Sequence, residues 1–349
     1  MAQNVGTPRF YVDILQWLKA QGDLSLSGVE WESDNLLDLI GINPTQSKTL
    51  IPEADNTTVG SNDVISFEAT SPFNLLMPND KNFFMVLGHN FATAGASIYV
   101  QEGEGTGEGN TWTGAAQSGL VNYNGSGSTS TVNQDGFSIS IGSDAHNIQT
   151  NLLRFRLDAT STDYNTDIQI GSLLYGTYYD MPHSPDLNLK LSYEYDGVKT
   201  IQTKGGATLS NATYTKPADW GDGGAWQLGS DESGNPISNL RSGRRVWDLS
   251  FSYLSDTDLM PAVAATTNLG AGYTEGTPTS DDTLLEGTDF FSRVINRTMG
   301  GHLPFIFQAD KSNNSPDQFA IARFDMNSFS YDQVANNVYN VKIKVREVW

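Results

Sequence analysis

The stretch Asn82–Val100, NFFMVLGHNFATAGASIYV, is the part of the sequence that decides the fold. Phe83–Leu87 is a continuous apolar run that ends at Gly88 and is too short for a helix. A second apolar run, Ile98–Val100, follows after a turn of small residues. The pattern predicts two buried strands joined by a short loop, which is the core of a β-sandwich.

The neighbouring segments repeat this strand pattern from residue 60 to residue 180. Val64–Phe67 begins it, and Asn74–Met77 follows. Apolar residues then alternate with polar ones in three more segments, at Phe137, Ile139 and Ile141, at Leu153, Phe155 and Leu157, and at Ile168 and Ile170. This alternation is typical of half-buried strands, so we expect an all-β domain over residues 60–180.

Two short motifs in this domain carry a resemblance. The first is Gly88-His89-Asn90 between two apolar strands, and the second is the "IG-x-L-x-x-G" strand Ile170–Gly176. In this order they resemble the discoidin or galactose-binding-like jelly roll found in virion proteins of tailed phages. The resemblance covers about a third of the chain. It implies a jelly-roll β-sandwich and a role in a phage particle.

The first 59 residues form a separate segment in this interpretation. Phe10–Ala20 places Tyr11, Ile14, Leu15 and Leu18 on one helical face, and Gly22 gives a stop signal. A segment this short cannot form a core of its own, so we expect it to pack on another part of the protein or on a neighbouring subunit. Two alternatives stay open, a helical extension on its own domain and an arm that reaches a neighbouring subunit.

Residues 181–349 predict a second β-rich domain. Its strands are read from Leu187, Leu189, Leu191 and Tyr193, from Val246–Tyr253, from Leu303–Phe307 and from Tyr339–Val345. Met260–Asp282 shows no periodicity and is expected to be a loop. The layout is similar to phage tail and structural proteins, in which a final strand ending in an acidic residue, here Glu347, closes the domain.

Composition excludes several classes of function. The 349 residues include 20 Lys and Arg against 40 Asp and Glu, a formal net charge of −20, so nucleic acid and anionic membranes are not expected partners. There is no cysteine, which excludes disulfides and thiolate chemistry. The first ten residues, MAQNVGTPRF, predict no secretory signal, and no run of about 18 apolar residues predicts a membrane span.

One candidate metal site is visible. Asp163, Asn165 and Asp167 have the D-x-N-x-D spacing that begins an EF-hand loop. Ile168 stands at the sixth position and Leu174 at the twelfth, so the full loop fails. A looser structural calcium site, which the resemblance to jelly rolls of this type implies, and a plain turn are the two interpretations. No other cofactor is expected.

Three further groups invite a functional interpretation beside a structural one. Trp220, Asp222 and Trp226 lie in a glycine-rich stretch and would stack on a sugar ring if exposed, or pack under a loop or a subunit if buried. The basic cluster Arg241, Arg244 and Arg245 would pair with carboxylates or bind an anion. His89, next to Asn90, would satisfy backbone groups of a tight turn or contact a ligand.

Motifs of the common enzyme classes are missing. The sequence has no G-x-S-x-G, no Walker-type loop, no G-x-G-x-x-G after a strand and no H-E-x-x-H. The sequence cannot identify a catalytic carboxylate pair of a glycosidase, because 40 acidic residues offer too many possible pairs. We therefore expect a non-enzymatic chain.

Together with the resemblance, this predicts a structural protein of a tailed-phage virion that assembles in the host cytoplasm. A tail component comes first, then a neck or head-decoration protein. It would act as a homo-oligomer and through contacts with other virion proteins. Sheet edges, the N-terminal segment and Met260–Asp282 are the expected contact surfaces. The alternative is a carbohydrate-binding or receptor-binding module that recognises host surface glycans.

Overall fold

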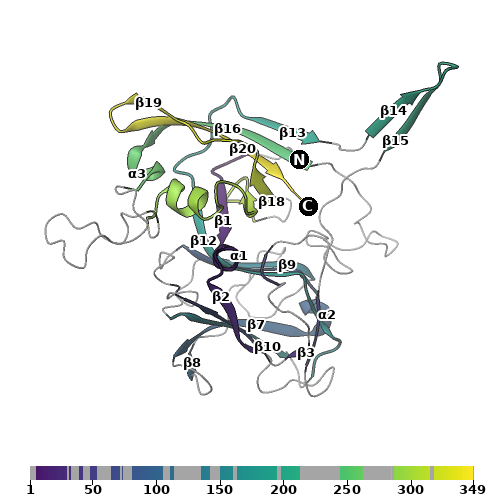
Figure 1. The fold of residues 1–349 in the computed structure, drawn as a ribbon, viewed down its shortest axis with the longest axis vertical. Coiled ribbons are helices and arrows are strands. Elements are labelled where there is room, and N and C mark those ends of the chain that lie inside the picture. Colours follow the sequence, from purple (N-terminus) through teal and green to yellow (C-terminus); the bar gives the residue numbers. More distant parts are fainter. Residues whose placement is uncertain are drawn as a thin grey trace.

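The computed structural model describes residues 5–29, 31–32, 39–41, 48–52, 64–70, 73, 81–104, 111–113, 135–141, 150–159, 163–194, 198–212, 244–261, 284, 287–314 and 318–348. Within these residues the chain is mostly β, with a few short helices (Figure 1). The expectation of a β-rich fold is confirmed for these residues. All strand pairs are antiparallel.

The largest sheet of the described structure has ten strands. Its order is β13-β16-β20-β18-β17-β1-β12-β6-β9, and β19 also pairs with β20. The bounds are β1 Arg9–Asp13, β6 Asn82–His89, β9 Gly136–Ile141, β12 Ser172–Asp180, β13 Lys190–Glu194, β16 Arg244–Ser255, β17 Phe305–Gln308, β18 Phe319–Phe324, β19 Tyr331–Ala335 and β20 Val338–Glu347.

Three smaller sheets accompany it. A five-stranded sheet has the order β2-β5-β10-β7-β8, with β2 Leu24–Val29, β5 Val64–Ala69, β7 Ala96–Glu104, β8 Thr111–Thr113 and β10 Leu152–Ala159. A three-stranded sheet joins β11 Ile168–Ile170, β4 Lys48–Pro52 and β3 Trp31–Glu32. A hairpin consists of β14 Val198–Gln202 and β15 Thr208–Ala212. The helical segments are α1 Ile14–Gln21, α2 Phe91–Ala94, α3 Asp256–Leu259 and the π-helix η6 Phe291–Asn296.

The apolar run Phe83–Leu87 is the strand β6, and every residue of β6 is buried. Phe84 and Val86 face a core shared with the five-stranded sheet, where Phe155 stacks on Phe84 at 5.2 Å. Phe83, Met85 and Leu87 face a second core on the opposite side. Both faces of β6 are therefore covered, which explains why its sequence is apolar without alternation. The prediction of two buried strands around Gly88-His89-Asn90 is confirmed.

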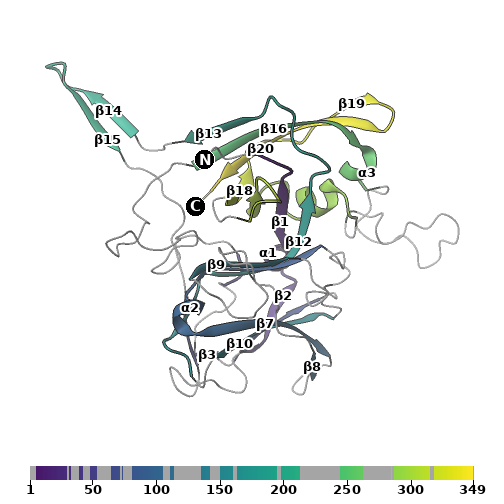
Figure 2. The same cartoon turned by 180° about the vertical axis from the view of Figure 1, so that it is seen from behind.

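Between β5 and β12 the chain crosses repeatedly from one sheet to the other. The strands β6, β9 and β12 lie in the ten-stranded sheet, and β5, β7, β8 and β10 lie in the five-stranded sheet. Figure 2 shows these two layers from behind, with β9 and β12 above β7 and β10.

The strand β1 joins the two halves of the ten-stranded sheet. It pairs with β12 on one side and with β17 on the other. Residues 1–59, 60–180 and 181–349 thus all contribute strands to one continuous sheet. Gly176 of β12 lies so close to β1 that a Cβ there would be 2.0 Å from the Val12 carbonyl oxygen, so only glycine fits. The described part of the N-terminal segment therefore packs on the rest of the same chain.

The expected helix over Phe10–Ala20 is correct only from Ile14 onward. Phe10, Tyr11 and Val12 are strand residues, and Tyr11 does not belong to a helical face. Aromatic and β-branched side chains favour a strand, and hydrogen-bonded neighbours on both sides stabilise it there. Asp13 then caps α1 through its carboxylate, and Gly22 ends it with a φ of 80°, which confirms the stop signal.

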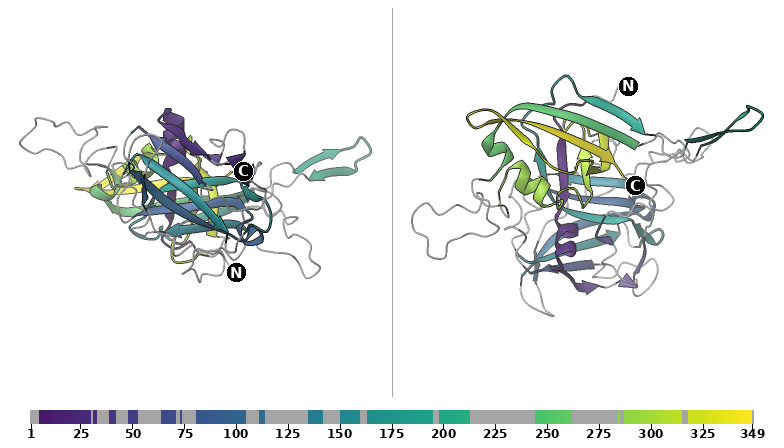
Figure 3. Two further views of the ribbon diagram at one scale, coloured as in Figure 1. Left: turned by 90° about the horizontal axis from the view of Figure 1, so that it is seen from below. Right: turned by 45° about the horizontal axis from the view of Figure 1, so that its top comes forward.

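A third core fills the second half of the molecule. One face of β16 and β20 packs with η6, α3 and the strands β17 and β18; the large side chains of this core include Trp247, Phe251, Phe290, Phe305 and Phe307. The opposite face of β13, β16 and β20 points outward, and the right panel of Figure 3 looks onto this layer. The strand expected from Leu187 begins only at Lys190, because Leu187 lies in a turn and is fully exposed.

Candidate functional site

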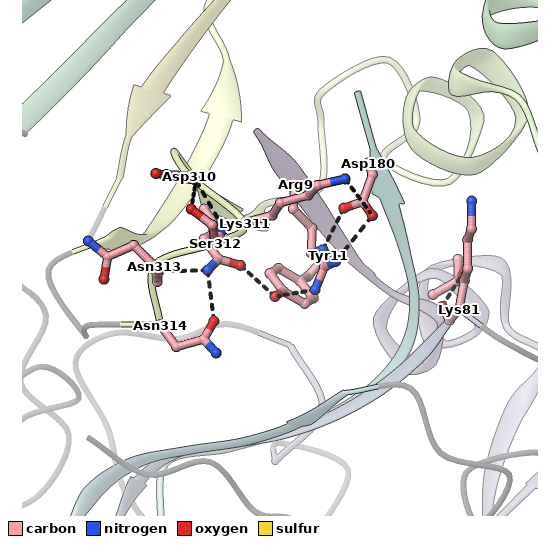
Figure 4. Close-up of polar contacts among 11 residues, drawn as sticks. Arg9, Tyr11, Lys81, Asp180, Asp310, Lys311, Ser312, Asn313 and Asn314 are labelled. Carbon is pink, nitrogen blue, oxygen red and sulfur yellow. Dashed lines mark hydrogen bonds and ion pairs between the residues drawn. The ribbon is translucent and has the colours of Figure 1, made fainter. Parts of the chain in front are cut away.

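A polar cluster ties the three central strands together (Figure 4). Arg9 of β1 donates two hydrogen bonds to the Asp180 carboxylate of β12, at 2.5 and 3.1 Å. Its guanidinium also lies 4.2 Å from the centre of the Tyr178 ring. Lys311 approaches Asp180 at 3.5 Å. These contacts hold the end of β1 against β12 and the turn after β17.

Tyr11 continues the cluster into the interior. Its hydroxyl donates to the Gln308 side-chain oxygen at 2.7 Å, and Gln308 in turn donates to Asn313 and Asn314. Burial raises the pKa of Tyr11 above its usual range, so the phenol keeps its proton. A protonated, fully buried tyrosine whose proton is already donated to an amide is suited to fixing strands, and not to proton transfer.

The Gly88-His89-Asn90 motif is a structural turn. The His89 ring accepts a hydrogen bond from the Phe91 backbone N–H at Nδ1, so its proton lies on Nε2 and is donated to Ser138 at 2.9 Å. The Asn90 side chain donates to the Asp167 carbonyl at 2.7 Å and accepts from the Gln169 N–H at 2.7 Å. The interpretation that these side chains satisfy backbone groups of a tight turn is confirmed.

This geometry predicts the charge state of His89. Burial lowers the pKa of the ring to about 3, because the charged imidazolium would be removed from water. We expect ring-nitrogen NMR shifts of the folded protein to report a neutral ring with the proton on Nε2 from pH 7 down to pH 5. The partly exposed His183 serves as the internal control. A His89 ring that becomes doubly protonated near pH 6 contradicts this assignment.

The candidate calcium residues lie in the turn between β10 and β11. The Asn165 N–H donates to the Ala94 carbonyl at 2.9 Å and its side chain to the Thr93 carbonyl at 3.3 Å. Asp163 is exposed and Asp167 half-buried. Across the described residues, no group of three or more His, Asp or Glu side chains is arranged to hold a metal ion. The turn is fixed by contacts with α2, and calcium binding stays a prediction.

Other candidates lie outside the described residues. They are Trp220, Asp222 and Trp226, together with Arg241 and nearly all of the loop Met260–Asp282. Sugar stacking on the two tryptophans therefore stays a prediction.

The remaining arginines of the basic cluster, Arg244 and Arg245, begin β16, and Arg244 is half-buried opposite Glu194 of β13. Arg245 is buried and forms an ion pair with Glu347 at 2.9 Å. It also donates to the Phe319 carbonyl at 2.7 Å and lies 5.1 Å from the centre of the Trp247 ring. Pairing with a carboxylate of the same chain is thus confirmed for Arg245, and that carboxylate comes from the end of the last strand, β20.

The hairpin β14–β15 stands apart from the other described strands. Its strands pair with each other and with no other described strand, and it projects from the body in Figures 1 and 2. Ile201 and Leu209 are directly opposite each other and keep 67 % and 60 % of their surface exposed. The turn between them contains Gly206 with a φ of 83°. Sequence reasoning missed this hairpin, although Gly205-Gly206 between two alternating runs is a hairpin signal.

No family model, curated protein or solved structure matches this chain. In the part of the chain that the structure describes, no helix has the length and apolar character needed to cross a membrane. Within the described residues, buried polar contacts hold the strands together, and an exposed apolar pair lies on the projecting hairpin.

Proposed function

We propose that the chain is a non-enzymatic structural subunit of a tailed-phage virion, assembled in the host cytoplasm. A tail component is the first assignment, with a neck or head-decoration protein next. The subunit acts by binding further copies of itself and other virion proteins. The short motifs around Gly88-His89-Asn90 and Ile170–Gly176 support the phage assignment by their resemblance.

A jelly-roll topology for the first half of the chain belongs to the same proposal, and the strand order supports it. Eight strands are taken in chain order: β1, β5, β6, β7, β8, β9, β10 and β12. One sheet then holds the first, eighth, third and sixth strands side by side, and the other holds the second, seventh, fourth and fifth. Two sheets connected in this manner form the double Greek key of a jelly roll.

The proposal of self-association rests on the hairpin β14–β15. A two-stranded hairpin alone is marginally stable in water, and it becomes stable when an apolar face is covered. Ile201 and Leu209 form such a face, and no described part of the same chain pairs with this hairpin. The hairpin segment 198–212 also has two lysines and no acidic residue, in a chain with 40 acids. A second, acidic copy therefore fits it in both polarity and charge.

The test is the mass of the protein in solution, measured by light scattering over a range of concentrations. The variant Ile201→Thr with Leu209→Thr keeps the strand preference and removes the apolar pair. Each covered side chain is worth about 1.5–3 kcal/mol, so half-assembly should need at least about a tenfold higher concentration in this variant.

The matched control changes the opposite face of the same hairpin. Thr200→Ser with Thr208→Ser should assemble at the same concentration as the unchanged protein, because these side chains alternate with Ile201 and Leu209. Equal assembly of all three proteins, or an unchanged protein that remains monomeric at every concentration, overturns the proposal.

A further inference from the structure

The outward face of the ten-stranded sheet has a charge opposite to that of the whole chain. Lys342, Lys344 and Arg346 occupy alternate positions on β20, between Val341, Ile343 and Val345, which are buried in the core. The three cations consequently point away from the core, about 7 Å apart along the strand. Arg323 of β18 lies beside Arg346, and Lys190 of β13 lies in the same row as Lys344. We call these five residues the basic stripe.

Part of the basic stripe is neutralised within the chain. Arg346 pairs with Glu194 at 2.7 Å, and Lys344 pairs with Asp325 at 2.6 Å. The pKa of Lys344 is raised by its hydrogen bond to Asp325, with smaller contributions from Glu194 and Asp248, so all three carboxylates lie near it. Among the described residues, the five basic residues of the stripe thus lie near the three carboxylates that surround Lys344 and near Asp332, which faces Asn340 on the same side of β20. In the whole chain, by contrast, acids outnumber bases two to one.

The other members of the stripe lack such partners. Lys190, Arg323 and Lys342 are exposed, and among the described residues none of them forms an ion pair. Arg323 and Arg346 are also direct cross-strand neighbours, an arrangement of like charges that costs stability in an isolated sheet. Carboxylates from outside the chain would remove this cost.

We propose that the basic stripe binds the acidic surface of a second copy of this chain. The inference deepens the proposed self-association and rests on it, but it uses a different surface from the hairpin. Every copy has a formal charge of −20, so each copy presents the carboxylates that the stripe attracts. A basic stripe cannot bind the same stripe of another copy, so the proposed contact is head-to-tail, between the stripe of one copy and an acidic surface of the next.

Salt separates this contact from the hairpin contact. Exposed ion pairs are screened by salt, whereas apolar contacts are not weakened by it. Sedimentation velocity at 50 mM and at 500 mM NaCl should show association of the unchanged protein weakening at least about tenfold at the higher salt concentration. The variant Arg323→Glu with Lys342→Glu should associate at least about tenfold more weakly at 50 mM NaCl and should lose most of the salt dependence.

The control variant is Lys81→Glu, compared with the single stripe variant Lys342→Glu, because both change the net charge equally and Lys81 lies next to β6, at the other end of the ten-stranded sheet from β20. It should associate like the unchanged protein, and the melting temperatures of all variants should confirm folding. If the stripe variant associates normally while the Ile201→Thr, Leu209→Thr variant does not, the stripe inference fails and the proposed function stands. If the stripe variant associates normally but no longer binds heparin, the stripe is a binding site for a soluble polyanion and not for a second copy, and the inference is overturned.

Discussion

Replacing Glu347 by Gln is expected to lower the free energy of unfolding by about 3–5 kcal/mol, because the buried guanidinium of Arg245 then loses the negative charge of the carboxylate that it faces. The side chains of Arg245 and Glu347 are 10 % and 3 % exposed, so water cannot take the place of the carboxylate. The Glu347 carboxylate accepts hydrogen bonds from the Arg245 backbone N–H and from its guanidinium. Urea unfolding at pH 7 measures the effect.

Two comparisons make this prediction specific. The double variant Arg245→Met with Glu347→Leu removes both charges and should recover most of the lost stability, because a well-packed apolar pair can replace a buried ion pair. The ion pair Lys344–Asp325 on the same sheet is 44 % and 42 % exposed. Asp325→Asn should therefore cost less than about 1 kcal/mol. A Glu347→Gln variant as stable as Asp325→Asn contradicts the prediction.

The sequence could identify those elements whose burial leaves a local pattern. The strand β6 was predictable because two cores, one on each face, require an unbroken apolar run from Phe83 to Leu87. The final strand was predictable because one face meets a core and the other meets water. In both cases the pattern records which faces are covered, and this is independent of the distant partner strands.

Elements defined by distant partners could not be read in this way. Phe10–Val12 fits a helical period, but its conformation is decided by β12 and β17, which follow more than 160 residues later. The partner of Arg245 lies 102 residues away among 40 acids, so only the type of contact was predictable. Leu187 alternates correctly with Leu189 and Leu191, yet no neighbouring strand pairs with it, and alternation alone does not form a strand.

Asp13 illustrates how a local signal gains its importance from tertiary structure. An aspartate directly before an apolar helical run is an ordinary N-cap, and Asp13 accepts the Leu15 N–H at 3.0 Å. In the folded chain it also accepts the Tyr175 N–H from β12, and its second oxygen is buried without a hydrogen bond in the described structure. The cap therefore lies inside the junction of β1, α1 and β12, and its carboxyl group is removed from water.

Burial consequently raises the pKa of Asp13 from 3.8 to about 7, although the hydrogen bonds from Tyr175, Gln16 and Leu15 act in the opposite direction. Below pH 4 the group is protonated in both the folded and the unfolded chain. Between pH 4 and pH 7 the unfolded chain loses the proton and the folded chain keeps it. Stability from this group is thus fully present below pH 4 and falls by about 1.4 kcal/mol per pH unit up to pH 7.

Asp13→Asn keeps the shape and the accepting oxygen of the cap but has no proton to lose. We expect the unfolding free energy of this variant, relative to the unchanged protein, to rise by about 4 kcal/mol between pH 4 and pH 8, so that the variant is the more stable protein at pH 8. Urea unfolding of both proteins at matched pH values measures this difference. Because both proteins share every other titrating group, including His89, those contributions cancel in the difference.

The exposed Asp332 on β19 provides the control for charge. Asp332→Asn also removes one carboxylate from this acidic chain, at an exposed position, and is measured at the same pH values. If the difference for Asp13→Asn varies with pH no more than that for Asp332→Asn, the Asp13 carboxyl is ionised in the folded state and its buried oxygen has a partner in solution. A rise of several kcal/mol toward pH 8 instead identifies the junction of β1, α1 and β12 as the part of the fold that weakens as the pH rises.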